Sequence, residues 1–208
     1  MGHLGSHHRK EETRMRRHRC IRRGLALGLM VMFAATLAGS ALADNVTGTA
    51  EVTGGSLTMS ATDGPAFTAA NGNGFTLNGT DQTKTDPFNI DVVDARRTGA
   101  GWNLQITSTT FSTGGTSPKT LVTNASQITA VSVTCDQGTC TNPSNSVTYP
   151  LTVPAGSTPP TAVKFYNAAI DTGMGDFTVT PTWSLSVPAN AYAGTYTSTV
   201  TITIASGP

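Results

Sequence analysis

The chain has 208 residues, of which 38% are hydrophobic and 12% are charged, and its formal net charge at pH 7 is +1. This length suffices for one domain with a hydrophobic core. Low charge combined with many apolar residues at strand spacing excludes an intrinsically disordered chain.

The first 43 residues have the organisation of a secretory signal peptide. The basic segment "RKEETRMRRHRCIRR" precedes the apolar stretch "LALGLMVMFAATLA", which is followed by small residues up to Ala43. The apolar stretch falls short of the roughly 20 residues that a bilayer core requires, which disfavours the alternative of a membrane anchor. We predict cleavage between Ala43 and Asp44, with translation starting at Met1 or at Met15.

Removal of residues 1–43 changes the charge of the domain that remains, residues 44–208. All four histidines leave with the signal peptide, and five basic residues remain against ten acidic ones, a net charge of −5. A mildly acidic surface disfavours nucleic acid and anionic membranes as partners. We therefore expect a secreted single domain with no nucleic-acid partner and no membrane span.

Apolar and polar residues alternate along most of this domain, with the period of two that is typical of strands with one buried face. The alternation is longest over residues 177–187 and 196–204, where most of the polar positions are Thr or Ser. Shorter strand patterns span residues 57–61, 75–77, 88–92, 102–106, 128–133, 147–153 and 163–165.

Clusters of Gly, Pro and Asn separate these segments. No part of the mature chain has the period of a helix. The pattern predicts an all-β fold, a single antiparallel β-sandwich of Ig-like or Greek-key type with about nine to ten strands. Within the segment 177–187, Pro181 predicts either an edge position or a bulge, because proline cannot donate a hydrogen bond to a neighbouring strand.

Two cysteines remain in the mature chain, Cys135 and Cys140 in "VTCDQGTC". An even cysteine count in an exported protein favours a disulfide, and this short spacing allows a bridge across a tight turn. We predict a Cys135–Cys140 disulfide that clips a hairpin or loop. The spacing differs from CxxC, which disfavours a redox pair.

The mature chain lacks the residues that most catalytic sites need. Without histidine, neither a hydrolase triad nor a histidine-ligated metal can form. The segment "DTGMGD" places Asp171 and Asp176 around two glycines, but it lacks the spaced oxygen ligands of a typical calcium loop and favours an ordinary turn. We predict no catalytic residue, no metal and no cofactor, although an enzyme that uses carboxylates alone is a conceivable alternative.

The two tryptophans of the chain both begin a Trp-x-Leu sequence, Trp102–Leu104 in "DARRTGAGWNLQI" and Trp183–Leu185 in "TPTWSLSV". The first block resembles the proximal motif of WxL-domain proteins, which are surface proteins of Gram-positive bacteria. The residues that carry this resemblance are Asp94, Arg96, Gly99, Gly101, Trp102 and Leu104.

The C-terminal segment "VPANAYAGTYTSTVTITIASGP" is similar to the last segment of the same family, through Gly194 and Tyr196. In that register, Ile202-Thr203-Ile204 occupies the place of the distal Trp-x-Leu of the family. Trp183–Leu185 lies one predicted strand earlier. Either Trp183–Leu185 pairs with the last strand and substitutes for the missing motif, or its match to the Trp-x-Leu sequence is a coincidence.

The resemblance implies a non-catalytic protein held non-covalently on cell-wall peptidoglycan, alone or assembled with other surface proteins. It makes Trp102, Leu104, Trp183 and Leu185 candidate binding residues. Strand alternation instead puts both tryptophans on the apolar side of their strands, where they would stabilise the core. Contact residues would then be polar or lie on loops.

Two further possibilities follow from the residues. Tyr166, Tyr192 and Tyr196 could stack on sugar rings, although tyrosines on sandwich strands more often pack in the core. The alternative to wall binding is a self-assembling structural subunit, pilin-like or sheath-like, in which exposed strand edges pair between copies.

Overall fold

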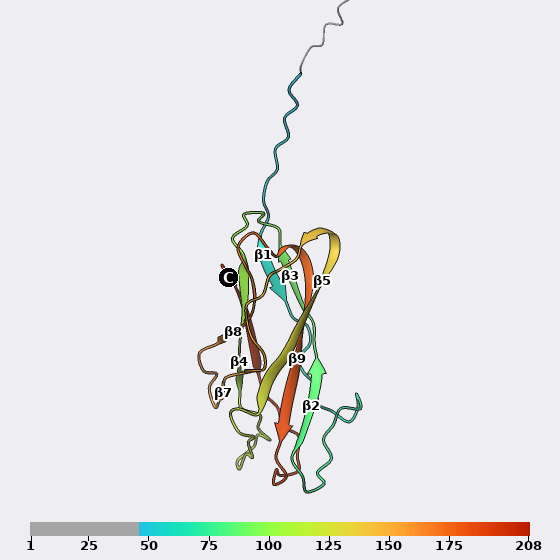
Figure 1. Cartoon of the computed structure of the whole chain (residues 1–208). Helices are drawn as coiled ribbons and strands as arrows, with labels where there is room; N and C mark the ends of the chain where they lie inside the picture. Colours follow the sequence, from blue (N-terminus) through green and yellow to red (C-terminus); the bar gives the residue numbers. More distant parts are fainter. Residues whose placement is uncertain (1–45) are drawn as a thin grey trace, which may run out of the picture. The chain divides into compact units, whose positions relative to one another are not determined.

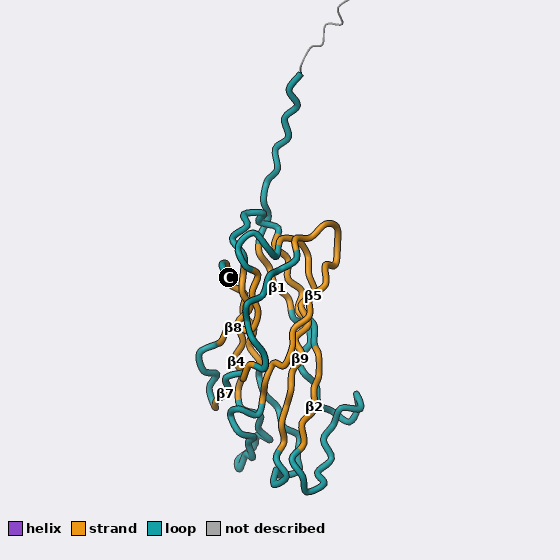
Figure 2. The backbone as a smooth tube through the Cα atoms, viewed as in Figure 1, coloured by secondary structure: helices purple, strands orange, loops and turns teal. Residues whose placement is uncertain are grey.

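The computed structural model describes residues 46–208, so the predicted signal peptide lies outside the described residues. Residues 50–208 form one compact unit. Figure 2 shows that this unit is built from strands and loops alone. Over residues 46–208, no helix is long and apolar enough to cross a membrane.

Ten strands make up the fold (Figure 1). They are β1 (Leu57–Ser60), β2 (Gln82–Pro87), β3 (Ile90–Asp94), β4 (Trp102–Thr109), β5 (Ser126–Thr141), β6 (Leu151–Thr152), β7 (Ala155–Gly156), β8 (Val163–Ala168), β9 (Met174–Val187) and β10 (Val200–Ser206).

The strands form two sheets (Figure 1). The six-stranded sheet has the order β1-β3-β9-β5-β6, and β2 follows β3 along the same edge of β9. The four-stranded sheet has the order β10-β4-β7, with β8 pairing with β4 as well. All pairs are antiparallel except the short parallel contact of β4 with β7. The prediction of an all-β antiparallel sandwich is confirmed.

The core lies between the two sheets because each of the longer strands presents alternating apolar residues to it. Strand β4 contributes Trp102, Leu104 and Ile106, which are all fully buried. Strand β9 contributes Val179 and Trp183 from the facing sheet, also fully buried. One contiguous hydrophobic cluster joins these side chains.

One predicted strand is absent, another is shorter than predicted, and the strands β2 and β7 were missed. Residues 75–77 form no strand, and only Leu151–Thr152 is paired within the predicted segment 147–153. Strand β2 escaped the pattern because its half-buried positions are Gln82, Lys84 and Asp86 rather than apolar residues. Its place is set by backbone pairing with β9.

Pro181 lies inside the six-stranded sheet, so an edge position is wrong. Strand β9 is flanked by β5 on one side and by β3 and then β2 on the other. Along β9, Pro181 lies between the stretch that pairs with β3, which ends at Val179, and the stretch that pairs with β2, which begins at Thr182. Its carbonyl accepts a hydrogen bond from Phe88 N at 3.2 Å. On the β5 side, the register shifts between Ile128 and Ala130. The proline is therefore accommodated at an irregular point of the ladder.

The predicted Cys135–Cys140 disulfide is present. Both cysteines lie within β5 rather than across a hairpin, which corrects the predicted location. The pairing of β5 with β9 shifts register between Cys135 and Gln137 and again before Thr141, and Gly138 has a φ of +66°. The bridge therefore clips a bulge at the end of one long strand.

Candidate functional site

Asp94 and Arg96 of the predicted motif form an ion pair at one end of the sandwich. Asp94 is the last residue of β3, and only 1% of its side chain is exposed. Arg96 Nε donates to Asp94 Oδ1 and an Arg96 terminal nitrogen donates to Asp94 Oδ2, both at 2.9 Å. This two-pronged geometry is the strongest that arginine makes with a carboxylate. The hydrogen bonds with Asp94 raise the pKa of Arg96 above its ordinary value.

The same guanidinium joins the two sheets. It donates to the carbonyl of Gly101 at 2.9 Å and to Ser206 Oγ at 2.6 Å. Gly101 immediately precedes β4 and Ser206 ends β10, whereas Asp94 belongs to the other sheet. We call Asp94, Arg96, Gly101 and Ser206 the arginine node. The node fixes three strand ends relative to one another.

The glycines of the motif make the close turn between the node and β4 possible. Gly99 and Gly101 have φ values of +68° and +69°, which favour glycine. A Cβ at Gly101 would meet the carbonyl of Ala168, and one at Gly99 would meet the side chain of Asp171. These two glycines are therefore structural requirements of the turn.

Trp102 begins β4 and is completely buried. Its indole Nε1 donates to the carbonyl of Gly173 at 2.8 Å, and its ring lies 5.8 Å from the ring of Tyr166. Gly173 has a φ of +71°, and a Cβ there would lie 2.6 Å from the indole nitrogen. The first Trp-x-Leu thus packs against the turn before β9 with no surface left for a ligand.

Tyr166 beside Trp102 gives the domain a predictable response to alkaline pH. Burial, and to a lesser extent the neighbouring Tyr149, raises the pKa of Tyr166 to about 12 from 10.0. Since the unfolded chain ionises first, the stability from this neutral phenol is intact below pH 10 and lost as pH rises through 12. We expect the free energy of unfolding to fall by roughly 2 kcal/mol across that window.

Guanidinium unfolding curves at several pH values measure this loss. Tyr166→Phe is the control, because it keeps the ring and removes the ionisable group. The variant should lose less stability than the parent between pH 10 and pH 12. An equal loss in both proteins would assign the alkaline sensitivity to other groups.

Trp183 lies in the opposite sheet, so of the two alternatives for the second Trp-x-Leu, pairing with the last strand does not hold. Its neighbours across the ladder are Asp86 of β2 and Ile128 of β5. The ring is fully buried, 6.4 Å from the ring of Phe88. Its indole Nε1 has no hydrogen-bond partner among the described residues.

The last strand instead pairs with the first motif. Strand β10 runs antiparallel to β4, so Ile204 lies opposite Leu104 and Ile202 opposite Ile106. The segment that resembles the distal motif therefore lies directly beside the strand of the proximal one. The four predicted binding residues are Trp102, Leu104, Trp183 and Leu185, and each is at most 4% exposed.

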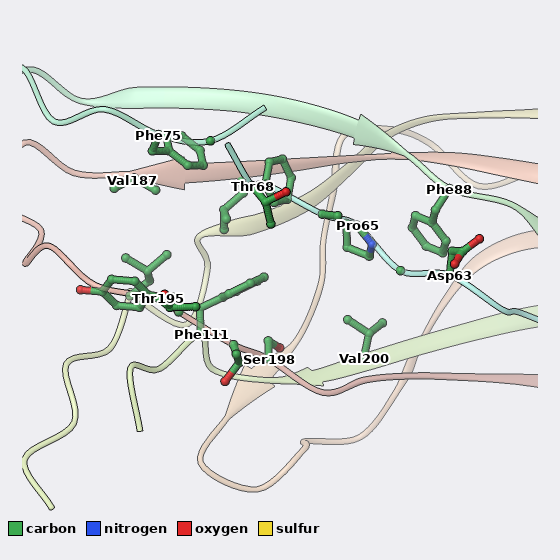
Figure 3. A pocket seen from close by; sticks show the side chains of 18 of the residues that line it. Asp63, Pro65, Thr68, Phe75, Phe88, Phe111, Val187, Thr195, Ser198 and Val200 are labelled. Atoms are coloured by element: carbon green, nitrogen blue, oxygen red, sulfur yellow. The ribbon is translucent and has the colours of Figure 1, made fainter. Parts of the chain in front are cut away.

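An open groove lies along β10, toward the end of the sandwich where β4 finishes. Its volume is about 1110 Å³. The walls come from residues 61–69, from Gly74, Phe75 and Leu77, from residues 192–198 and from β10. Figure 3 shows Phe75, Pro65 and Thr68 on one side of the groove and Phe111, Thr195 and Val200 on the other.

Four of the residues predicted from the sequence contribute to this groove. Leu185 lines its base although only 4% of it is exposed, and Gly194 and Tyr196 belong to its C-terminal wall. At the rim, Tyr192 is 63% exposed, and Lys119 Nζ lies 4.4 Å from the centre of its ring. Only one lining residue, Asp63, is charged. The groove can accept an apolar or weakly polar extended ligand.

Strong metal ligands are not gathered in the described part of the chain. Over residues 46–208, no group of three His, Cys, Asp or Glu side chains could hold a metal ion. Of the two aspartates in "DTGMGD", Asp171 lies in a turn with a φ of +61°, and its backbone N donates to the carbonyl of Gly99 at 2.8 Å. Asp176 instead lies in β9 and pairs with β5.

Comparison with known proteins decides the family. A family model described as WxL domain, surface cell wall-binding, matches residues 48–208. The chain belongs to the WxL family. Neither a curated protein nor a solved structure matches it. As a WxL domain, it is a cell-wall-binding domain of the cell surface. In this WxL protein, the motif residues hold the two sheets together through the arginine node and pack the core through the buried Trp102.

Proposed function

We propose that this WxL protein is exported with residues 1–43 as its signal peptide, and that residues 44–208 hold it non-covalently on peptidoglycan without catalysing a reaction. The observation that carries the proposal is the family match over residues 48–208. The mature chain supports it with a net charge of −5 and no histidine. Such a surface does not suit nucleic acid, and the mature chain lacks histidine, the residue most often used in general acid–base chemistry.

We propose that loop residues, rather than the motif tryptophans, contact the wall. Tyr192 is the most exposed aromatic residue of the described chain, and it lies in the loop between β9 and β10. Lys119 Nζ lies over its ring and supplies a positive charge. An exposed aromatic ring with an ammonium group over one of its faces suits the sugar rings and the peptide carboxylates of peptidoglycan.

Replacement of the exposed tyrosine tests this assignment. We expect Tyr192→Ala to weaken binding to purified walls by about tenfold, which corresponds to ~1.4 kcal/mol. The free energy of unfolding should change by less than about 0.5 kcal/mol, because the side chain is exposed. Sedimentation with increasing amounts of wall measures the affinity.

Ile170→Ala is the matched control, since Ile170 is 65% exposed and lies in the turn that bonds to Gly99, at the other end of β4. This variant should bind walls as the parent does. Equal binding by all three proteins would remove Tyr192 from the contact surface. A loss in both variants would indicate non-specific apolar adhesion instead.

A further inference from the structure

The groove follows a strand edge that has no partner within residues 46–208. Strand β10 pairs only with β4, and across the groove β1 pairs only with β3. The alternate residues Tyr196, Ser198, Val200 and Ile202 line the groove and are only half-buried. An unpaired edge beside a half-exposed apolar row is a template for one additional strand.

The chain contains a segment with the pattern of such a strand. Residues 46–53 read "VTGTAEVT", so Val46, Gly48, Ala50 and Val52 alternate strictly with polar residues. Every residue of this segment is exposed, Val46 at 91% and Val52 at 85%. Within the compact unit, no hydrogen bond joins residues 50–53 to the sandwich.

We propose that residues 46–53 of one copy of this protein bind in the groove of a second copy as an added strand along β10. The apolar side chains of Val46, Ala50 and Val52 face into the groove, and the Thr side chains and Glu51 face water. The main chain of the segment bonds to the free edge of β10. The inference does not rest on wall binding, although Tyr192 at the rim lines this groove as well.

The length, the side-chain size and the charge of residues 46–53 fit the groove. Eight residues in extended form span about 26 Å, which is close to the length of the stretch 196–202 that follows the groove. The inward side chains are small, and Gly48 lets the added backbone approach closely. The one charge of the segment, on Glu51, has the outward parity, so no charge enters a groove lined by a single carboxylate.

A second copy is favoured over the segment's own groove because of where the chain enters the sandwich. Gly55 N donates to the carbonyl of Ala95 at 2.9 Å, so the pairing with β3 continues past the start of β1. The groove begins at Met59, at the opposite end of β1. The preceding residues would have to reverse direction to reach it. Contact between unlike surfaces of successive copies produces rings or open chains.

Analytical ultracentrifugation of residues 44–208 over a wide concentration range tests the proposal. We expect the mass to rise with concentration in the parent and to stay that of a monomer in Val46→Asp/Val52→Asp. Thr47→Asp/Thr53→Asp is the matched control, since it adds the same charge on the outward parity. It should assemble as the parent does.

Peptide binding supplies a second readout that does not depend on polymer formation. A labelled peptide of residues 44–55 should bind the chain that begins at Gly54, and the peptide with both valines replaced by Asp should bind at least about tenfold more weakly. Circular dichroism verifies the fold of each protein. A parent that is monomeric at every concentration, or equal effects of the two double substitutions, would overturn the proposal.

A cross-link identifies the groove that is occupied. With Val52→Cys and Ile202→Cys in separate copies, the proposal expects a mixed disulfide dimer on oxidation. With both substitutions in one chain, it expects a ladder of multimers. A cross-linked monomer alone from the doubly substituted chain would place the segment in its own groove and contradict exchange between copies.

Discussion

Trp102→Ala should lower the free energy of unfolding by about 3–5 kcal/mol, the usual cost of removing a large buried aromatic side chain. The ring is completely buried, and its loss also leaves the Gly173 carbonyl without the indole donor. Because a domain of this size is stable by only about 5–15 kcal/mol, the variant would be close to unfolding at moderate temperature. Equilibrium unfolding in urea measures the loss.

Trp102→Phe separates the packing of the ring from its hydrogen bond. It keeps an aromatic ring near Tyr166 but cannot donate to Gly173. We expect a loss of about 1–2 kcal/mol, mainly from the unsatisfied carbonyl. If Trp102→Ala unfolds at the same urea concentration as the parent, the core role assigned to Trp102 is wrong.

Asp94→Ala should cost about 3 kcal/mol, the second large effect, because removal of one partner leaves the other charge without compensation. Asp94 is 1% exposed and Arg96 is 17% exposed, so water can replace the lost carboxylate only in part. The arginine would also lose the anchor that directs it to Gly101 and Ser206. The midpoint and slope of urea unfolding report the change.

A double-mutant cycle with Arg96→Ala isolates the pair from the packing of each side chain. The double variant should be less destabilised than the sum of the two single variants, with a coupling energy above about 1 kcal/mol. Strict additivity would show that Asp94 and Arg96 contribute separately and that the arginine node does not act as a unit.

The sequence predicted the sandwich wherever a strand buries one apolar face. Segment 177–187 is an example, because Phe177, Val179 and Trp183 point into the core while Thr and Ser face outward. The rule failed at β2, whose inward positions carry Lys84 and Asp86. Lys84 Nζ donates to the Gly74 carbonyl and Asp86 accepts from Ala66 N, so loop contacts replace apolar burial there.

The site was less accessible to sequence reasoning than the fold. The motif identified the family and three of the four residues of the arginine node, but alternation alone could not show that Arg96 reaches Ser206 in a strand 110 positions away. The groove could not be predicted because its walls are irregular segments around residues 61–77 and 192–198. Tyr192 and Tyr166 look alike in sequence, and only tertiary packing exposes the first and buries the second.

We propose that this WxL domain binds cell walls through its surface while its motif tryptophans stabilise the core. Sedimentation of residues 44–208 with purified Gram-positive walls tests it most directly, with folded Trp102→Phe measured in parallel. We predict saturable binding of equal affinity for both proteins. Absence of binding to every wall preparation would contradict wall association, and loss of binding by a fully folded Trp102→Phe would contradict the core assignment.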